Sequence, residues 1–127
     1  MGKRNYKMVK KTLVLGASLN PERYSNVAIK RLVLKNYHVI AVGIKSGRIN
    51  EINIYNELIV HKNIHTVTIY LNQKRQKEYY NYIISLKPVR VIFNPGTENQ
   101  VFYKILEKES IVYVEACTLV LLSTNQY

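Results

Sequence analysis

The sequence contains very little cysteine and no long apolar run. The single cysteine, Cys117, excludes an internal disulfide among the 127 residues and is typical of a reducing compartment. The apolar stretch after the basic N-terminus, Thr12 to Leu15, is too short for a signal-peptide core, and no run approaches a membrane span. Position 6 is Tyr6 rather than Ser or Thr, so the myristoylation pattern that Gly2 would begin is incomplete. We therefore expect a cytoplasmic protein that does not enter a membrane.

Acidic residues are also scarce, because eight Asp and Glu face 19 Lys and Arg, which gives a formal net charge of +11. Such a charge raises the question of a nucleic-acid partner. The lysines, however, are scattered and form no basic helix or arginine-rich block. Lys, Asn, Ile and Tyr all have A/T-rich codons, and that bias adds lysines without selection for a partner. We favour compositional bias and solvation, and keep a nucleic-acid-associated basic protein as an alternative.

The length fits one domain. We place a basic N-terminal extension at residues 1–10 and the folded domain at residues 11–127. Short apolar, β-branched runs predict buried strands. The five predicted strands cover residues 11–16, 38–43, 66–71, 89–94 and 110–114.

Helical patterns separate these strands. Asn20 and Pro21 predict the cap and first turn of a helix that ends near Asn36. Residues 73–86 predict a second helix with one apolar stripe, which ends before Pro88. A third helix follows a cap at Thr97 or Asn99. The predicted stripe consists of Tyr79, Tyr80, Ile83 and Leu86, and the buried face of the third helix of Val101, Phe102, Ile105 and Leu106.

Two segments are less regular. Residues 46–62 predict irregular structure with a short helical turn, and residues 118–122 form a last apolar run. The alternation of strands and helices predicts an α/β fold with right-handed crossovers. We expect a doubly wound, mainly parallel five-stranded Rossmann-like sheet with helices on both faces.

In such a sheet, ligands bind at the carboxyl ends of the strands, where the strand order reverses. The first loop there begins with the small residues Gly16, Ala17 and Ser18, whose backbone N–H groups could approach a diphosphate. Polar groups follow at Asn20, Arg23 and Ser25, and the next helix directs its positive end toward this loop. The alternative is an ordinary tight turn without a ligand.

Two features of dinucleotide-binding domains are missing. The Gly-x-Gly-x-x-Gly fingerprint is absent, and no acid follows the second strand to bind a ribose hydroxyl. Lys45 and Arg48 occupy that region instead. Two cations there favour a phosphorylated ribose, either the 3′-phosphate of coenzyme A or the 2′-phosphate of NADP, although both side chains could simply be solvated.

Four segments in order, residues 15–25, 39–45, 91–99 and 114–117, resemble the small stand-alone CoA-binding proteins. These proteins are similar to the CoA-binding domain of the succinyl-CoA synthetase α subunit. The resemblance rests on the Gly-Ala-Ser…Asn-Pro-x-Arg-x-Ser loop combined with Asn-Pro-Gly-Thr-Glu-Asn, and it covers nearly the whole chain. Gly43-Ile44 replaces the Asn-Pro that often precedes the lysine. No phosphohistidine segment is present, so ligase chemistry is not implied.

The resemblance implies roles for matching positions. The loop after the first strand would line the diphosphate, Lys45 would lie near the adenosine phosphate, and Asn72 would border the adenine or ribose. The turn from Asn94 to Thr97 would form a wall along the pantetheine arm. The expected binding residues are Gly16, Ala17, Ser18, Asn20, Arg23, Ser25, Gly43, Lys45, Asn72, Asn94, Pro95, Gly96, Thr97 and Cys117.

No catalytic or metal-binding constellation is evident. The histidines, His38, His61 and His65, form no recognisable triad, and one cysteine with dispersed histidines makes no metal motif. We hypothesise that Cys117 exchanges disulfides with the thiol of coenzyme A; the alternative is a small buried apolar side chain. The clustered tyrosines favour core and interface packing, which is compatible with a homodimer.

We therefore expect a non-enzymatic module that binds coenzyme A or an acyl-CoA, for sensing or carriage. The alternatives are an NADP-binding protein or oxidoreductase and the nucleic-acid-associated protein.

Overall fold

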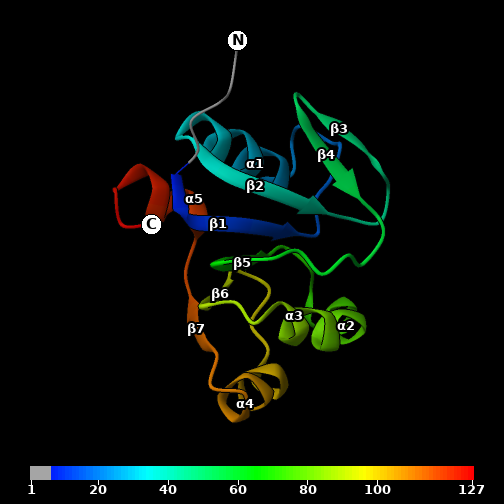
Figure 1. Cartoon of the computed structure of the whole chain (residues 1–127), viewed down its shortest axis with the longest axis vertical. Helices are drawn as coiled ribbons and strands as arrows, with labels where there is room; N and C mark the ends of the chain where they lie inside the picture. The colour runs from blue at the N-terminus through cyan, green and yellow to red at the C-terminus, as the bar shows by residue number, and fades with distance from the viewer. Residues whose placement is uncertain (1–6) are drawn as a thin grey trace.

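Strands and helices alternate along the chain as the sequence predicts, except between residues 37 and 69, where four strands follow one another (Figure 1). The computed structural model describes the backbone of residues 7–127 and the side chains of residues 10–127. The strands are β1 (Lys7–Leu15), β2 (Tyr37–Val42), β3 (Gly47–Ile49), β4 (Ile52–Tyr55), β5 (Thr66–Ile69), β6 (Arg90–Phe93) and β7 (Val112–Glu115). The helices are α1 (Tyr24–Leu34), α2 (Gln73–Gln76), the 3-10 turn η1 (Lys77–Tyr79), α3 (Tyr80–Leu86), α4 (Gln100–Lys108) and α5 (Thr118–Ser123).

The strands form one sheet in the order β3-β4-β2-β1-β5-β6-β7. Every neighbouring pair is parallel except β3 and β4. Leu13 of β1 lies opposite Ile40 of β2 and Val67 of β5, so the apolar runs meet in register at the centre of the sheet. The mainly parallel α/β architecture is confirmed.

The predicted number of five strands is wrong, because the described sheet has seven. The two additional strands come from the segment 46–62, for which the sequence predicted irregular structure with a helical turn. Ile49 pairs with Ile52 across a two-residue turn in which Asn50 has a φ of 52°. Each of these two strands is only three or four residues long and carries polar side chains. The apolar alternation that identifies a strand is therefore too short to recognise in the sequence.

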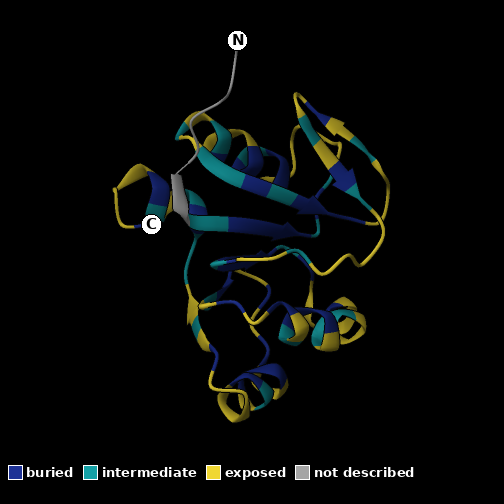
Figure 2. Ribbon diagram, viewed as in Figure 1, coloured by how far each residue is buried: buried dark blue, intermediate teal, exposed yellow. Residues whose placement is uncertain are grey.

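Helices cover both faces of the sheet (Figure 2). On one face, α3 and α4 contribute side chains such as Ile83 and Phe102 to a core with Leu13 and Val67. On the other face, α1 and α5 pack over the strands, as Leu32 and Leu122 show. The clustered tyrosines belong largely to the first core, because Tyr82 is buried there and Tyr79 and Tyr80 pack against it.

Three helix details differ from the sequence prediction. Helix α1 begins at Tyr24 with Arg23 as its N-cap, because Asn20 uses its side chain in the preceding turn. The predicted helix 73–86 is divided into α2, η1 and α3. In α4, Tyr103 is buried and Val101 is exposed, so the buried face is rotated from the predicted one.

Strand β1 begins at Lys7, inside the segment 1–10 that we assigned to an extension; residues 1–6 of that segment lie outside the described residues. The last apolar run, 118–122, forms most of α5.

Candidate functional site

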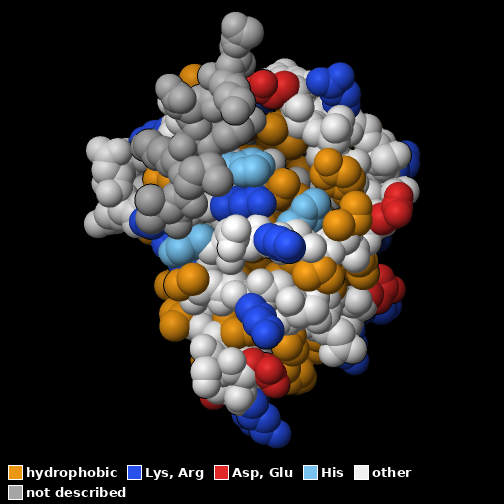
Figure 3. Space-filling model, viewed as in Figure 1, with side chains coloured by type: hydrophobic (Ala, Val, Ile, Leu, Met, Phe, Trp, Pro, Cys, Tyr) orange, Lys and Arg blue, Asp and Glu red, His pale blue; other side chains and the backbone are white. Residues whose placement is uncertain are grey.

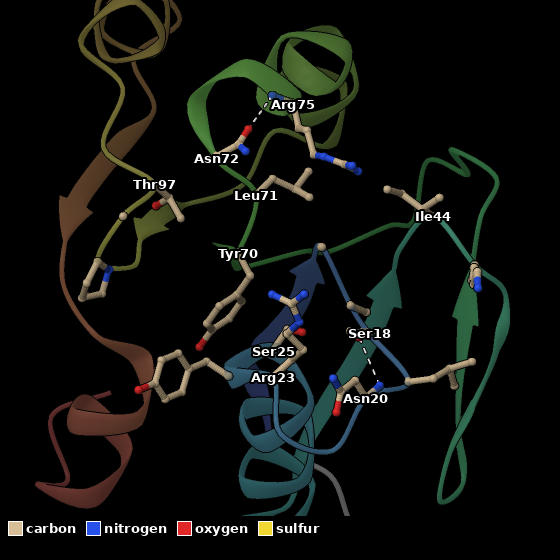
Figure 4. A pocket seen from close by; sticks show the side chains of 17 residues that line it. Ser18, Asn20, Arg23, Ser25, Ile44, Tyr70, Leu71, Asn72, Arg75 and Thr97 are labelled. Atoms are coloured by element: carbon tan, nitrogen blue, oxygen red, sulfur yellow. Dashed lines mark hydrogen bonds between the residues drawn. The ribbon is translucent and has the colours of Figure 1, made fainter.

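A pocket of about 800 Å³ lies where the loops after β1, β2, β5 and β6 converge (Figure 4). Strand β1 stands between β2 and β5, so the chain reverses its direction of travel across the sheet at this point. This is the edge at which open α/β sheets bind ligands. The predicted residues that line the pocket are Gly16, Ala17, Ser18, Asn20, Arg23, Ser25, Lys45, Asn72, Pro95, Gly96 and Thr97.

The first turn of the β1–α1 loop is held by the sheet. The N–H groups of Gly16 and Ala17 both donate to the carbonyl of Val42 at 2.9 Å. Gly16 has a φ of +93°, and a Cβ there would lie 3.1 Å from the backbone of Tyr70. Both amides donate to β2, so they are not free to donate to a diphosphate as the sequence analysis expected.

The remainder of this loop is fixed by its own polar side chains. The Oγ of Ser18 accepts a hydrogen bond from the N–H of Asn20 at 3.1 Å, and Asn20 Oδ1 accepts one from the N–H of Glu22 at 3.0 Å. Asn26, buried on α1, donates through its side chain to the carbonyl of Ser18 at 2.9 Å. The loop is therefore held by hydrogen bonds within the protein, and none of them uses the hydroxyl proton of Ser18.

The N-terminus of α1 opens on the pocket with its first amides unused. Its N-cap, Arg23, makes no side-chain capping bond, and the described residues supply no acceptor for the N–H groups of Tyr24 and Ser25. The first turn carries no acidic residue. Unpaired N–H groups and the helix dipole together favour an anion at this position.

Three cations surround the pocket from three separate elements. Arg23 precedes α1 and Arg75 belongs to α2 (Figure 4). Lys45, which also lines the pocket, follows β2. No Asp or Glu is among the described residues that line this pocket. Because nothing in the wall neutralises these side chains, the pocket suits a ligand that carries several negative charges.

Arg75 was missed by the sequence analysis. It stands in the polar run Gln73-Lys74-Arg75, which looks like a solvated helix surface. Asn72, expected to border an adenine or ribose, lines the pocket and also caps α2, because its Oδ1 accepts from the N–H of Arg75 at 3.0 Å. The position of Asn72, a capping residue type shortly after a predicted strand, could have indicated that a helix begins there and brings Arg75 to the pocket. The lining residues that are not among the expected binding residues, besides Arg75, are Leu19, Tyr24, Ile44, Tyr70 and Leu71; the position of all but Tyr70 in the loops at the carboxyl ends of the strands agrees with the predicted binding edge.

Three predicted residues do not line the pocket. Gly43 supports it from behind, because a Cβ at this position would lie 2.3 Å from the carbonyl oxygen of Ala17. Asn94 is buried and donates to Thr68 and Ile69. Cys117 is partly buried and serves as the N-cap of α5. Because Cys117 does not line the pocket, its thiol is not directly accessible from the pocket for the disulfide exchange that we hypothesised.

The histidines lie away from the pocket. Burial and the positive charge of Lys11 lower the pKa values of His38 and His61, and burial and Arg90 lower that of His65. Within residues 10–127, no three His, Cys, Asp or Glu side chains are grouped so that they could hold a metal. Across the described chain, no helix is both long and apolar enough to cross a membrane.

The fold and the pocket together define a Rossmann-like α/β domain with a polar site at the reversal of strand order. Residues 10–123 match the model of the CoA binding domain, and the chain belongs to this family. The family resemblance noted in the sequence is thereby confirmed. No protein with a curated description matches the chain.

Solved structures of similar size share this fold. A crystal structure of an uncharacterised protein is 46% identical, with a TM-score of 0.91 over 94% of this chain and 98% of that chain. A hypothetical protein from Pyrococcus horikoshii OT3 is 25% identical, with a TM-score of 0.83 over 91% and 83%. A Thermus thermophilus protein, 19% identical with a TM-score of 0.82 over 94% and 91%, shows the same fold.

Proposed function

We propose that the chain binds coenzyme A or an acyl-CoA in this pocket and performs no reaction itself. The observation that carries the proposal is the unpaired N-terminus of α1 beside three cations with no acid in the pocket wall. Coenzyme A has a diphosphate and a separate ribose phosphate, so it needs several positive groups at different places. Membership of the CoA binding domain family supports the same ligand.

The residues present fit the parts of this ligand. The Ser18 hydroxyl, the Arg23 guanidinium and the first amides of α1 would hold the diphosphate. Lys45 and Arg75 would hold the ribose phosphate. When bound, coenzyme A supplies a thiol or thioester; no His, Cys, Asp or Glu lines the described pocket to act on it as a base, which supports a role in sensing or carriage.

Calorimetric titration tests the proposal directly. Coenzyme A and acetyl-CoA should bind, whereas NAD, which lacks a ribose phosphate, should bind weakly. Arg23→Ala and Lys45→Ala should each raise the Kd about 10-fold or more, the usual loss for a hydrogen bond to a charged group. Lys104→Ala, on the outer surface of α4, serves as the control.

Three results would decide against the proposal. No heat with coenzyme A at millimolar concentration would defeat it. Tighter binding of NADP than of coenzyme A would assign the cations to a 2′-phosphate instead. Salt-dependent binding of DNA or RNA that survives both Arg23→Ala and Lys45→Ala would favour a nucleic-acid partner.

A further inference from the structure

Strand β7 forms an unprotected edge of the sheet. It pairs with β6 on one side, and no strand of the described chain pairs with its other side (Figure 1). Proteins usually guard such edges against pairing with another molecule, by charged side chains, proline or a very short strand. The opposite edge, β3, is guarded in this way, because it has only three residues and its central Arg48 is exposed. Strand β7 carries no basic residue and no proline, and its one charged side chain, Glu115, stands at its end.

The side chains of β7 on the face of α1 and α5 are apolar and exposed. Val112 is 64% exposed and Val114 is 39% exposed, and Val120 on α5 adds a third valine at 54%. Tyr113 lies between the two strand valines and points to the opposite face, where its ring stacks on Tyr103 with the centroids 4.4 Å apart. Figure 2 shows much of β7 as exposed. Apolar side chains gathered along an unpaired edge favour a contact with another protein chain.

The distribution of charge favours a second copy of the chain as the partner. All 19 Lys and Arg lie within residues 1–108, and residues 109–127 contain two acids, Glu109 and Glu115, and no basic residue. Two molecules that each carry a net charge of +11 repel each other over most of their surface. The segment 109–127, which includes β7 and α5, brings no positive side chain to a contact. Two copies can therefore approach each other there with the least repulsion.

The backbone of β7 determines which residues can pair across this edge. The N–H of Ala116 donates to the carbonyl of Phe93 in β6 at 3.1 Å. Because the polar backbone groups of successive strand residues point to opposite sides, those of Val112 and Val114 also point toward β6. The N–H and C=O groups of Tyr113 and Glu115 therefore point away from the sheet, where no strand of the described chain meets them.

We propose that β7 pairs antiparallel with β7 of a second copy about a two-fold axis at Val114, which joins the two sheets into one. In this register, Tyr113 of one copy and Glu115 of the other exchange backbone hydrogen bonds in both directions. Val114 lies opposite the same residue of the second copy, and Val112 lies opposite Ala116, so apolar side chains meet on one face. The contact is isologous, as in most homodimers, and it does not depend on the ligand of the pocket.

The two neighbouring registers are less favourable. An axis at Tyr113 would pair Glu115 with Ile111, whose N–H already donates to the carbonyl of Leu106 at 2.9 Å, so a backbone bond would be lost. An axis at Glu115 would place two carboxylates directly opposite each other, which is destabilising. The axis at Val114 avoids both costs, because each Glu115 then faces a tyrosine.

The mass of the full chain in solution, measured by light scattering after size exclusion, is the first test. The unmodified chain should have twice the 14.8 kDa of one chain at micromolar concentrations. Val114→Lys places two ammonium groups face to face at the axis, so it should give a monomer with an unchanged circular dichroism spectrum. Val101→Lys is the matched control, because it adds the same charge at an exposed valine of α4, and it should remain a dimer.

Cysteine cross-linking is the second test, and it decides the register even if Val114→Lys fails to fold. In a Cys117→Ala background, Val114→Cys should form a disulfide-linked dimer when it is oxidised with copper phenanthroline. Directly opposite residues of a non-hydrogen-bonded pair have their Cα atoms about 4.5 Å apart, which is within the range of a disulfide. Val101→Cys in the same background should remain largely unlinked on a non-reducing gel.

Four results would refute the inference. An unmodified chain that is monomeric at these concentrations has no such contact. A dimer that persists in a folded Val114→Lys variant uses another surface, and a dimer lost equally in Val101→Lys responds to added charge alone. Equal cross-linking of Val101→Cys and Val114→Cys excludes the axis at Val114. Each result leaves the proposed binding of coenzyme A unaffected, since that is measured by titration of the pocket.

Discussion

Asn94 joins three elements beneath the pocket through one amide side chain. Its Nδ2 donates to Thr68 Oγ1 at 2.7 Å and to the carbonyl of Ile69 at 2.9 Å, while its Oδ1 accepts from the N–H of Thr118 at 2.9 Å. The side chain is buried, and both of its amide N–H groups and its carbonyl oxygen have partners inside the protein. The sequence correctly placed Asn94 at the end of a strand; its orientation, away from the ligand side, depends on α5, which lies far along the chain.

Asn94→Ala should lower the free energy of unfolding by about 2–4 kcal/mol, because it removes three buried bonds and leaves partners unsatisfied. Urea denaturation measures this change. Asn56→Ala, at an exposed position, should change the free energy by less than about 0.5 kcal/mol. Similar values for the two variants would show that Asn94 is not a structural link.

Gly43 allows the β1–α1 loop to lie against the end of β2. A Cβ there would lie 2.3 Å from the carbonyl oxygen of Ala17, so Gly43→Ala must displace the backbone of the loop. We expect the Kd for coenzyme A to rise at least about 10-fold, since a small misplacement of a binding loop is costly.

Gly47→Ala provides the comparison for Gly43→Ala. Its Cβ would lie 2.8 Å from the Leu19 side chain, whose flexible end can move aside. Titration of both variants with coenzyme A should therefore show the larger effect at Gly43, and equal effects would contradict the steric argument.

An amide network joins α2 to the N-terminus of α4. Asn99 caps α4 by accepting from the N–H of Phe102 at 3.1 Å, and it donates to Gln76 Oε1 at 2.9 Å and to the Tyr80 hydroxyl at 2.8 Å. Gln76 in turn donates to the carbonyls of Leu71 and Thr97. The loops after β5 and β6 are thereby fixed to each other.

Asn99→Ala should reduce the free energy of unfolding by about 2–4 kcal/mol, because both the cap and the buried network are lost. Asn72→Ala, which removes a cap from the four-residue α2, should cost only about 1 kcal/mol. Thermal and urea denaturation of the two variants measure the difference. A larger loss for Asn72→Ala would show that the network contributes little.

Helices and strands with a long, regular pattern of apolar residues could be predicted from the sequence, and short ones could not. The central strands were recognised because runs such as Thr12 to Leu15 are apolar and β-branched, and the Asn99 cap of α4 is a local signal. The β3–β4 hairpin was missed because its strands are short and polar. The helix predicted at 73–86 is divided where Tyr79 has a φ of −112°, and sequence periodicity does not show such a local change of the backbone.

Across the whole molecule, positive side chains outnumber negative ones, with 19 Lys and Arg against eight Asp and Glu. Figure 3 shows histidine side chains close to lysine and arginine side chains on one face. Burial is the main cause that lowers the pKa values of all three histidines; Lys11 lowers those of His38 and His61 further, and Arg90 and Lys10 lower that of His65 further. Acidification would add charge to a surface that is already positive.

The free energy of unfolding should therefore fall in mild acid. A histidine whose folded pKa is lowered binds more protons when unfolded, so its contribution is present above the unfolded pKa of about 6.5 and is lost as the pH falls toward the folded pKa. Urea denaturation between about pH 8 and pH 5 should show this decline. A variant with His38, His61 and His65 all changed to Gln should show a weaker decline over the same range; an identical slope would assign it to other groups.

The bonds from Gly16 and Ala17 to Val42 have a kinetic consequence. Because hydrogen bonds within the protein hold this turn against β2, we expect that association does not have to wait for the loop to form. The encounter rate of a polyanion should then depend mainly on the attraction of a chain with net charge +11, and should decrease steeply as salt is added. The dissociation rate should be much less sensitive to salt, since it depends on contacts within the pocket. Stopped-flow measurement of coenzyme A binding at several ionic strengths would separate the two rates.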